Sequence, residues 1–117
     1  MRYALLIYVE PPQEAPSEAM NAEVMAAYNA FTSEAVAADV MRGGEALEDA
    51  KTATSVRVRN GQTLVTDGPF AETKEEFGGF YLIEAPNLDE AIKWAAKIPG
   101  AWHGRVEVRP IMEIPQQ

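Results

Sequence analysis

The sequence has no cysteine and only one histidine, His103, among its 117 residues. Without cysteine, the chain has neither a disulfide framework nor a thiolate metal site. A single histidine leaves carboxylates as the remaining metal ligands, and carboxylates alone suit only hard cations. We therefore expect neither a metal nor a cofactor.

Basic charge and long apolar runs are also scarce. Ten Lys and Arg stand against 18 Asp and Glu, and the resulting net charge of -8 opposes binding to nucleic acid. The apolar run at residues 2–9 is far shorter than the roughly 20 residues of a membrane span, and no signal-peptide cleavage pattern follows it. We expect a single domain over residues 1–117, in a cytoplasmic protein that binds neither nucleic acid nor membranes.

Four segments show the patterns of β-strands. Residues 2–9 and 80–85 are apolar on both alternating faces, which predicts strands that are covered on both sides. Asn60-Gly61 is the favoured two-residue hairpin turn, and it joins alternating runs at residues 54–59 and 62–66. In this register Val56, Val58, Thr63 and Val65 share one face, and Arg57 and Arg59 share the other.

Two helices and a last strand complete the prediction. An apolar stripe from Val24 to Ala38 predicts a helix that begins near Ser17 or Asn21 and ends at Gly43-Gly44. Asn87 and Glu90 resemble a capping box for a second helix, which Pro99-Gly100 ends. Its expected buried side comprises Leu88, Ala91, Ile92, Ala95 and Ile98. Residues 105–112 form the last strand, with Val106 and Val108 toward the core.

This order predicts an α+β domain of the ferredoxin-like, split βαβ type with an inserted β-hairpin. Two helices cover only one face of the sheet, yet the strands at residues 2–9 and 80–85 are apolar on both faces. A second sheet from an identical chain would cover the other face. We therefore expect a homodimeric α/β barrel.

Asp67 is the most notable candidate for a functional carboxylate. In the hairpin register it shares the side of Thr63 and Val65, where a carboxylate is costly to ionise without a hydrogen bond or a cation. Such a group suits proton transfer. The alternative is a structural Asp-Gly turn, although Pro69 lacks the N–H that an ordinary Asx-turn uses.

Other candidates surround the second half of the chain. His103 is a possible general base, or simply an exposed loop histidine. Arg105, Glu107 and Arg109 alternate along the uncovered face, where they either pair with one another or bind an anionic ligand. Pairing of Glu107 with an arginine across the dimer is the favoured alternative. Tyr3 or Tyr8, together with Tyr81, would line the same space as hydroxyl donors or as packing. Residues 72–76 read as a solvated connection.

Four stretches resemble the DGPF branch of the YCII-related proteins: the opening Arg2-Tyr3-Ala4-Leu5-Leu6-Ile7-Tyr8, then Asp67-Gly68-Pro69-Phe70-Ala71-Glu72-Thr73-Lys74-Glu75, Gly78-Gly79-Phe80-Tyr81, and Val106-Glu107-Val108-Arg109-Pro110. The resemblance covers nearly the whole chain. It implies a ferredoxin-like, dimeric α/β barrel in a superfamily of small isomerases, cofactor-free monooxygenases and heme-binding proteins. Some members of the branch are associated with extracytoplasmic-function sigma factors. The better-known YCII proteins carry a histidine in the first half of the chain, which this sequence lacks.

Two main hypotheses follow. The first is a homodimeric small-molecule enzyme, with Asp67 or His103 in acid–base chemistry and Arg109, Tyr3 and Tyr81 in substrate binding. The second is a ligand-sensing or partner-binding accessory protein without chemistry, linked to sigma-factor regulation. A dimeric stress protein without a defined ligand is a third alternative.

Overall fold

The structure is a computed structural model that describes residues 1–11, 17–69 and 73–115. Within these ranges the chain forms six strands, three α-helices and one short 3-10 helix. They are β1 (Arg2–Val9), α1 (Glu18–Ala37), β2 (Met41–Ala46), the 3-10 helix η1 (Ala50–Thr52), β3 (Thr54–Arg59), β4 (Gln62–Asp67), β5 (Glu76–Glu84), α2 (Leu88–Ala95), α3 (Gly100–His103) and β6 (Arg105–Pro110).

Four of the strands form one antiparallel sheet in the order β2-β5-β1-β6. Strands β1 and β2 are joined by α1 and run in the same direction, with β5 between them. This is a split βαβ arrangement, and the second one follows from β5, α2 and β6 around β1. The mixed α+β architecture is therefore consistent with the predicted ferredoxin-like fold.

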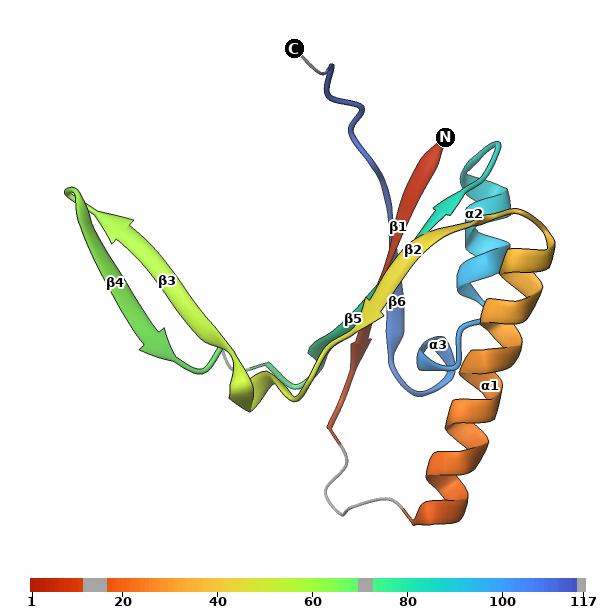
Figure 1. Cartoon of the computed structure of the whole chain (residues 1–117), viewed down its shortest axis with the longest axis horizontal. Helices are drawn as coiled ribbons and strands as arrows, with labels where there is room; N and C mark the ends of the chain where they lie inside the picture. Colours follow the sequence, from red (N-terminus) through yellow and green to blue (C-terminus); the bar gives the residue numbers. More distant parts are fainter. Residues whose placement is uncertain (12–16, 70–72, 116–117) are drawn as a thin grey trace.

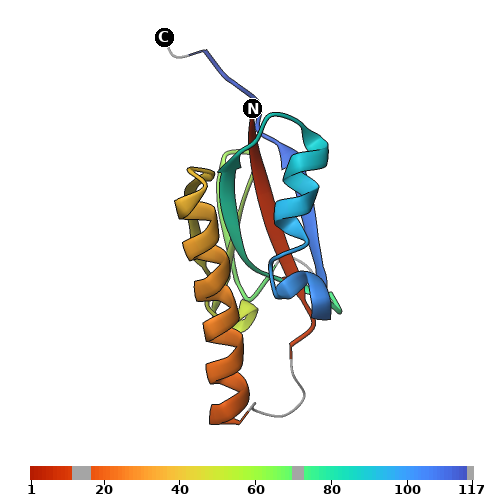
Figure 2. The same ribbon diagram turned by 90° about the vertical axis from the view of Figure 1, so that its right-hand side faces the viewer.

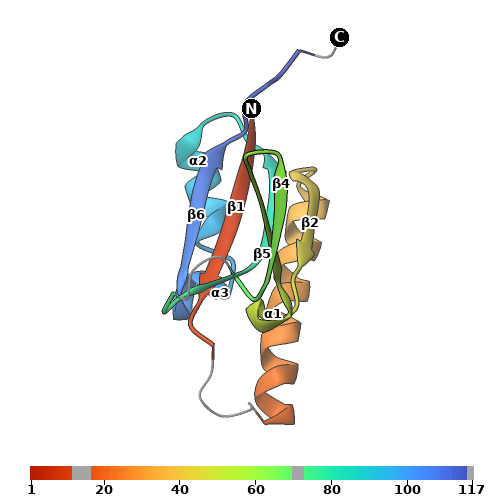
Figure 3. The same cartoon turned by 90° about the vertical axis from the view of Figure 1, so that its left-hand side faces the viewer.

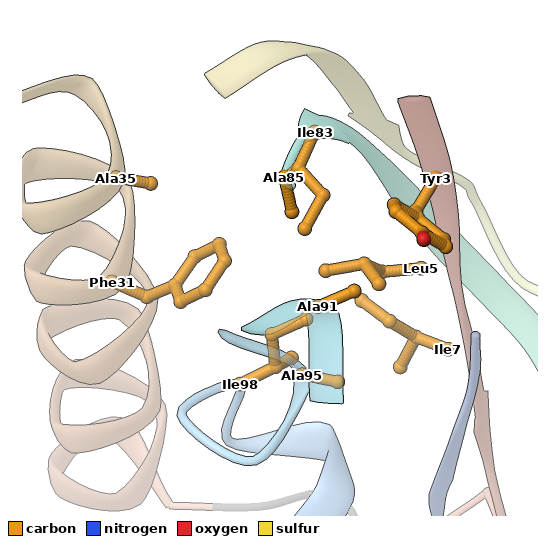
Figure 4. Close-up of a cluster of buried hydrophobic side chains, with 10 residues drawn as sticks. All are labelled: Tyr3, Leu5, Ile7, Phe31, Ala35, Ile83, Ala85, Ala91, Ala95 and Ile98. Carbon is orange, nitrogen blue, oxygen red and sulfur yellow. The ribbon is translucent and has the colours of Figure 1, made fainter. Parts of the chain in front are cut away.

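All three α-helices lie on the same side of this sheet (Figures 1 and 2). Alternation along β1 turns Tyr3, Leu5 and Ile7 toward the helices, where all three are buried. They meet side chains from α1, β5 and the α2 region in one apolar core (Figure 4). The remaining buried members are Phe31, Ala35, Ile83, Ala85, Ala91, Ala95 and Ile98.

The opposite face of the sheet, here called the open face, carries no helix from the described parts of the chain (Figure 1). Its residues from β1 and β5 include Leu6, Tyr8, Phe80 and Leu82, each of them only half-buried. In the described residues the helices cover one face of these strands, as predicted, and cover of the open face by a second copy stays a prediction.

Strands β3 and β4 form a separate two-stranded hairpin, which stands on the open side of the sheet (Figures 1 and 3). Its register runs from Thr54 opposite Asp67 to Arg59 opposite Gln62, as the Asn60-Gly61 turn predicts. Because the hairpin projects, the radius of gyration is 16.5 Å, whereas a compact domain of this length has about 13 Å.

The first helix ends earlier than predicted. Ser17 is its cap, since its hydroxyl accepts a hydrogen bond from the Met20 backbone N–H at 3.2 Å. The helix stops at Ala37, and Asp39 takes a left-handed conformation with φ 59°. Strand β2 therefore contains Gly43 and Gly44, the two residues that were predicted to end the helix.

The second helix also differs in part from the prediction. Asn87 caps α2 by accepting from the Glu90 backbone N–H at 3.0 Å, as predicted. Leu88 and Ile92 were expected on its buried side, but each is 48% exposed. The helix is only two turns long and presents Ala91 and Ala95 to the sheet, so its larger apolar side chains lie outside the core. No helix in the described ranges is both long and apolar enough to cross a membrane.

Candidate functional site

Asp67 lies at the end of β4, with its side chain exposed. The chain leaves the hairpin through Gly68, whose N–H bonds to the Ala53 carbonyl at 2.7 Å and whose carbonyl accepts from the Ser55 hydroxyl at 2.9 Å. Both sides of the hairpin are exposed in one chain, so the buried environment expected for Asp67 is absent there. Proton transfer by Asp67 stays a prediction from the motif.

Two of the tyrosines expected beside Arg109, Tyr3 and Tyr81, lie on the other face of the sheet, whereas Tyr8, the alternative to Tyr3, lies on the open face. Tyr3 is 2% exposed in the helix-side core, where its hydroxyl donates to the Met1 sulfur at 3.7 Å. Tyr81 packs on Phe31 of α1 at 4.8 Å between ring centroids. Arg109 pairs with Ala4 on the open face and is exposed. The expectation of one shared space is therefore corrected, because residues next to each other along β1 point to opposite faces.

His103 is the last residue of α3 and is exposed. The segment was expected as a loop, and it is instead one short helical turn whose Gly104 N–H bonds to the Gly100 carbonyl at 2.9 Å. This helix lies on the helix side of the sheet (Figure 2), away from the Arg109 face. Within one chain the five predicted site residues do not converge.

One polar cluster on the open face joins β1, β6 and the segment before β5. The Arg105 guanidinium contacts the Tyr8 ring at 4.4 Å from its centroid and bonds to the Glu75 carboxylate at 2.9 Å. Glu107 lies between Arg105 and Arg109, 3.9 Å from each. These charges pair within the chain, whereas the favoured expectation was pairing of Glu107 with an arginine across the dimer, which stays a prediction. Glu75, expected in a solvated connection, takes part in the cluster.

Residues 73–75, the end of the DGPFAETKE string, line a cavity of about 490 Å³ with Tyr8 and Arg105. The Thr73 hydroxyl bonds to the Glu75 carbonyl. Phe70, Ala71 and Glu72 of the same string lie outside the described residues. The DGPFAETKE string therefore begins at Asp67, at the end of the hairpin, and ends at Glu75, whose carboxylate pairs with Arg105 on the open face.

A second cavity, here called the α1 groove, lies between α1 and the β2–β5 edge of the sheet and has a volume of about 610 Å³. Val24, Met25 and Tyr28 of α1 form one wall. The backbone of two glycine pairs, Gly43-Gly44 and Gly78-Gly79, forms much of the other wall. This size and mainly apolar lining match the range of small-molecule sites.

Close approach of β2 to β5 requires glycine in this wall. A Cβ atom on Gly44 would lie 2.6 Å from the Phe80 carbonyl oxygen, and one on Gly79 would lie 2.9 Å from the Glu45 carbonyl oxygen. Because both neighbours are backbone atoms, they do not move aside cheaply. The glycines therefore shape the groove as well as the sheet edge.

Tyr28 supplies a polar group to the α1 groove. Burial raises the pKa of its hydroxyl above the ordinary value of 10.0, nearby Tyr81 adds to the rise, and a hydrogen bond with the Gly100 backbone opposes it. The hydroxyl is therefore protonated at neutral pH and can donate a hydrogen bond to a ligand. Among the described residues, no three histidine or carboxylate side chains gather closely enough to hold a metal ion.

Comparison with known proteins identifies the family. The model of the YCII-related domain matches residues 1–115. The chain belongs to the YCII-related family. An uncharacterised protein of Rhizobium meliloti (strain 1021), R00369, is 39% identical over 114 residues, which cover 95% of this chain and 92% of that protein. The resemblance to YCII-related proteins is thus confirmed, and the match leaves the activity of this family member open.

The structure adds two features that sequence reasoning did not assign to a site. Tyr28 was interpreted only as one member of the apolar stripe, although a tyrosine in such a stripe has a polar tip that needs a partner. The pairing of Glu75 with Arg105 joins residues 30 positions apart. No local pattern signals this contact, because it depends on how β6 lies beside β1.

Proposed function

We propose that this YCII-related protein binds a small, mainly apolar molecule in the α1 groove, with the Tyr28 hydroxyl as a hydrogen-bond donor. The observation that carries the proposal is the groove itself, an apolar space of about 610 Å³ with the half-buried Tyr28 among its lining residues. A ligand of this chemistry buries its surface against Val24 and Met25 and satisfies Tyr28.

The same proposal includes a homodimer in which the open faces of two sheets meet as an α/β barrel. Leu6, Phe80 and Leu82 support it, since these apolar side chains remain half-exposed in one chain. Face-to-face sheets pack about 10 Å apart and interdigitate such side chains. Membership of the DGPF branch, a catalytic role for Asp67 and a link to a sigma factor remain predictions from the sequence.

Binding in the α1 groove is testable with N-phenyl-1-naphthylamine, an uncharged fluorescent probe that the net charge of -8 does not repel. Val24→Trp should fill the groove and weaken probe binding by at least about tenfold. Val36→Trp is the matched control, because Val36 lies on the same helix, is exposed and does not line the groove.

The control variant should bind the probe within about twofold of the wild type, and circular dichroism should show both variants folded. If Val24→Trp binds the probe as tightly as Val36→Trp does, the groove is not the binding site. Tyr28→Phe then separates the shape of the groove from the hydrogen bond of the Tyr28 hydroxyl. This variant should bind the apolar probe as the wild type does and should bind 1-naphthol, which has a hydroxyl, more weakly.

A further inference from the structure

The β3–β4 hairpin, here called the arm, has an apolar face with no cover in one chain. Val56 and Val65 lie directly opposite each other and are 60% and 63% exposed, and neighbouring Val58 is 59% exposed. Thr63, opposite Val58, completes this valine face. Single exposed apolar residues are ordinary, but a contiguous group of them marks an interaction surface.

The arm also lacks the support that a two-stranded ribbon needs. Within residues 1–11, 17–69 and 73–115, β3 and β4 pair only with each other, and nearly all of their side chains are exposed. An isolated hairpin is at best marginally stable in water, and further strands or a packed face are needed. Another surface should therefore cover the valine face.

The direction of the arm favours a second copy of the chain as this surface. The arm stands on the open side of the sheet, in the space that a partner seated on the open face would enter (Figures 1 and 3). A space of about 1020 Å³ lies at the base of the arm, where Tyr8 and Phe77 of the sheet and Ala53 and Pro69 beside the hairpin are among its lining residues. In a two-fold dimer each arm must then reach past the interface to the other copy.

Charge supports the same partner. Residues 51–67 carry three basic side chains, Lys51, Arg57 and Arg59, and one acidic side chain, Asp67 at the end of β4. The rest of the chain has 7 basic and 17 acidic residues, so the arm with its base is net positive and the body strongly negative. A surface that is complementary to itself in this way suits the isologous contact of a symmetric dimer.

We propose that the arm is a clasp: its valine face packs against the partner copy and holds the dimer together. The inference rests on the proposed homodimer and adds the contact that completes it. Each arm orders its own hairpin only when the partner covers it, so folding of β3 and β4 is coupled to association. The surface takes a second copy of this chain, which brings both the acidic body and the opposite arm.

Val65→Asn and Leu64→Asn test this clasp as a matched pair. The two residues are neighbours in β4, both are exposed, and they point to opposite sides of the arm. Both variants place asparagine, a weak strand former, in β4, so the loss of strand stability from this change is common to both. Val65→Asn should raise the dimer dissociation constant by at least about tenfold, since the contact occurs twice per dimer. Leu64→Asn should raise it by less than about threefold.

Sedimentation velocity of the full chain over a range of concentrations measures both constants, and Leu82→Asn on the open face tests the sheet contact separately. If Leu82→Asn weakens the dimer while Val65→Asn behaves like Leu64→Asn, the clasp is overturned and the proposed dimer stands. If the wild type is monomeric at every concentration, both fail.

Hydrogen exchange of the wild type gives an independent readout without a substitution. Amides of residues 54–67 should exchange faster as the protein is diluted below its dissociation constant, in step with the loss of dimer. Exchange that is independent of concentration while the dimer dissociates would contradict the coupling between arm and partner.

Discussion

The two faces of the four-stranded sheet have similar apolar residues and very different surroundings. On the helix side of β1, Leu5 is 0% exposed and packs beneath α1 and α2. On the open face, the next residue, Leu6, is only half-buried. The same strand therefore meets a complete core on one side and an unfinished one on the other.

This difference shows that the described residues of one chain cover only the helix side of the sheet. Strands β1 and β5 are apolar on both faces, as strands buried on both sides are, but the described residues supply helices for only one of these faces. The arm repeats the contrast, with valines on one side and arginines on the other. Apolar area that a chain does not cover itself is the ordinary mark of association.

Leu5→Ala and Leu6→Ala should separate the two faces most strongly. Leu5→Ala creates a cavity in the core and should lower the free energy of unfolding by about 2–5 kcal/mol at every protein concentration. Leu6→Ala should lower the free energy of unfolding by less. This loss should grow with protein concentration, because part of the burial of Leu6 occurs in the dimer. Urea denaturation at two concentrations a hundredfold apart measures both.

Equal losses for Leu6→Ala at the two concentrations would show that the open face makes no contact between copies. The apolar residues of the open face would then need another explanation, such as cover by a ligand. The Leu5→Ala value serves as the internal control, since a fully buried position should not respond to concentration.

The elements predicted correctly from the sequence have their causes nearby in the chain. Alternation identified β1, and Asn60-Gly61 fixed the hairpin register, because a two-residue turn leaves only one pairing. Strand β2 was missed because its sequence, Met41 to Ala46, contains two adjacent glycines, which are poor strand formers. Its strand conformation depends on pairing with β5, more than 30 residues later.

The candidate sites were harder to predict for the same reason. The motif pointed to Asp67, whose neighbourhood in one chain is solvent, while the α1 groove needs α1, β2 and β5 in place before it exists. The contact between Arg105 and Tyr8 likewise requires β6 beside β1. A sequence indicates which residues have ionisable or hydrogen-bonding side chains, but the order of the strands in the sheet decides which of them come into contact.

Gly79→Ala and Gly78→Ala sharpen the contrast within β5. An added Cβ on Gly79 would meet the Glu45 carbonyl oxygen at 2.9 Å, so this variant should lose roughly 1–3 kcal/mol of stability through strain between β2 and β5. On Gly78 the nearest atom is a Val9 methyl at 3.7 Å, an ordinary contact.

Gly78→Ala should therefore change the free energy of unfolding by less than about 1 kcal/mol, because lower entropy of the unfolded chain offsets small adjustments. Thermal denaturation followed by circular dichroism measures both variants under the same conditions. Equal losses for the two would mean that β2 is free to move away from β5, and that glycine is not needed to shape the groove.

The smallest expected effect lies at the polar end of the open face, where Arg2 holds the segment after β6. The Arg2 guanidinium donates two hydrogen bonds to the Glu113 carboxylate, at 3.1 and 3.0 Å. The hydrogen bond and charge of Arg2 lower the pKa of Glu113 below its ordinary value of 4.5. A carboxylate with a lowered folded-state pKa is held in its charged form above that ordinary value. This contact should persist above pH 4.5 and be lost as the pH falls through the lower, folded-state pKa.

A carboxyl-carbon NMR titration of Glu113 should show this lowered pKa, and Arg2→Gln should return it toward 4.5. Glu84 and the amino terminus also lie near this pair, so Glu84→Gln is the control, and it should leave the pKa of Glu113 below its ordinary value. Both members of the pair are on the surface, where salt screens them. Overall stability should therefore hardly change in Arg2→Gln. If Glu113 titrates identically in the wild type and Arg2→Gln, the segment after β6 is not held by Arg2.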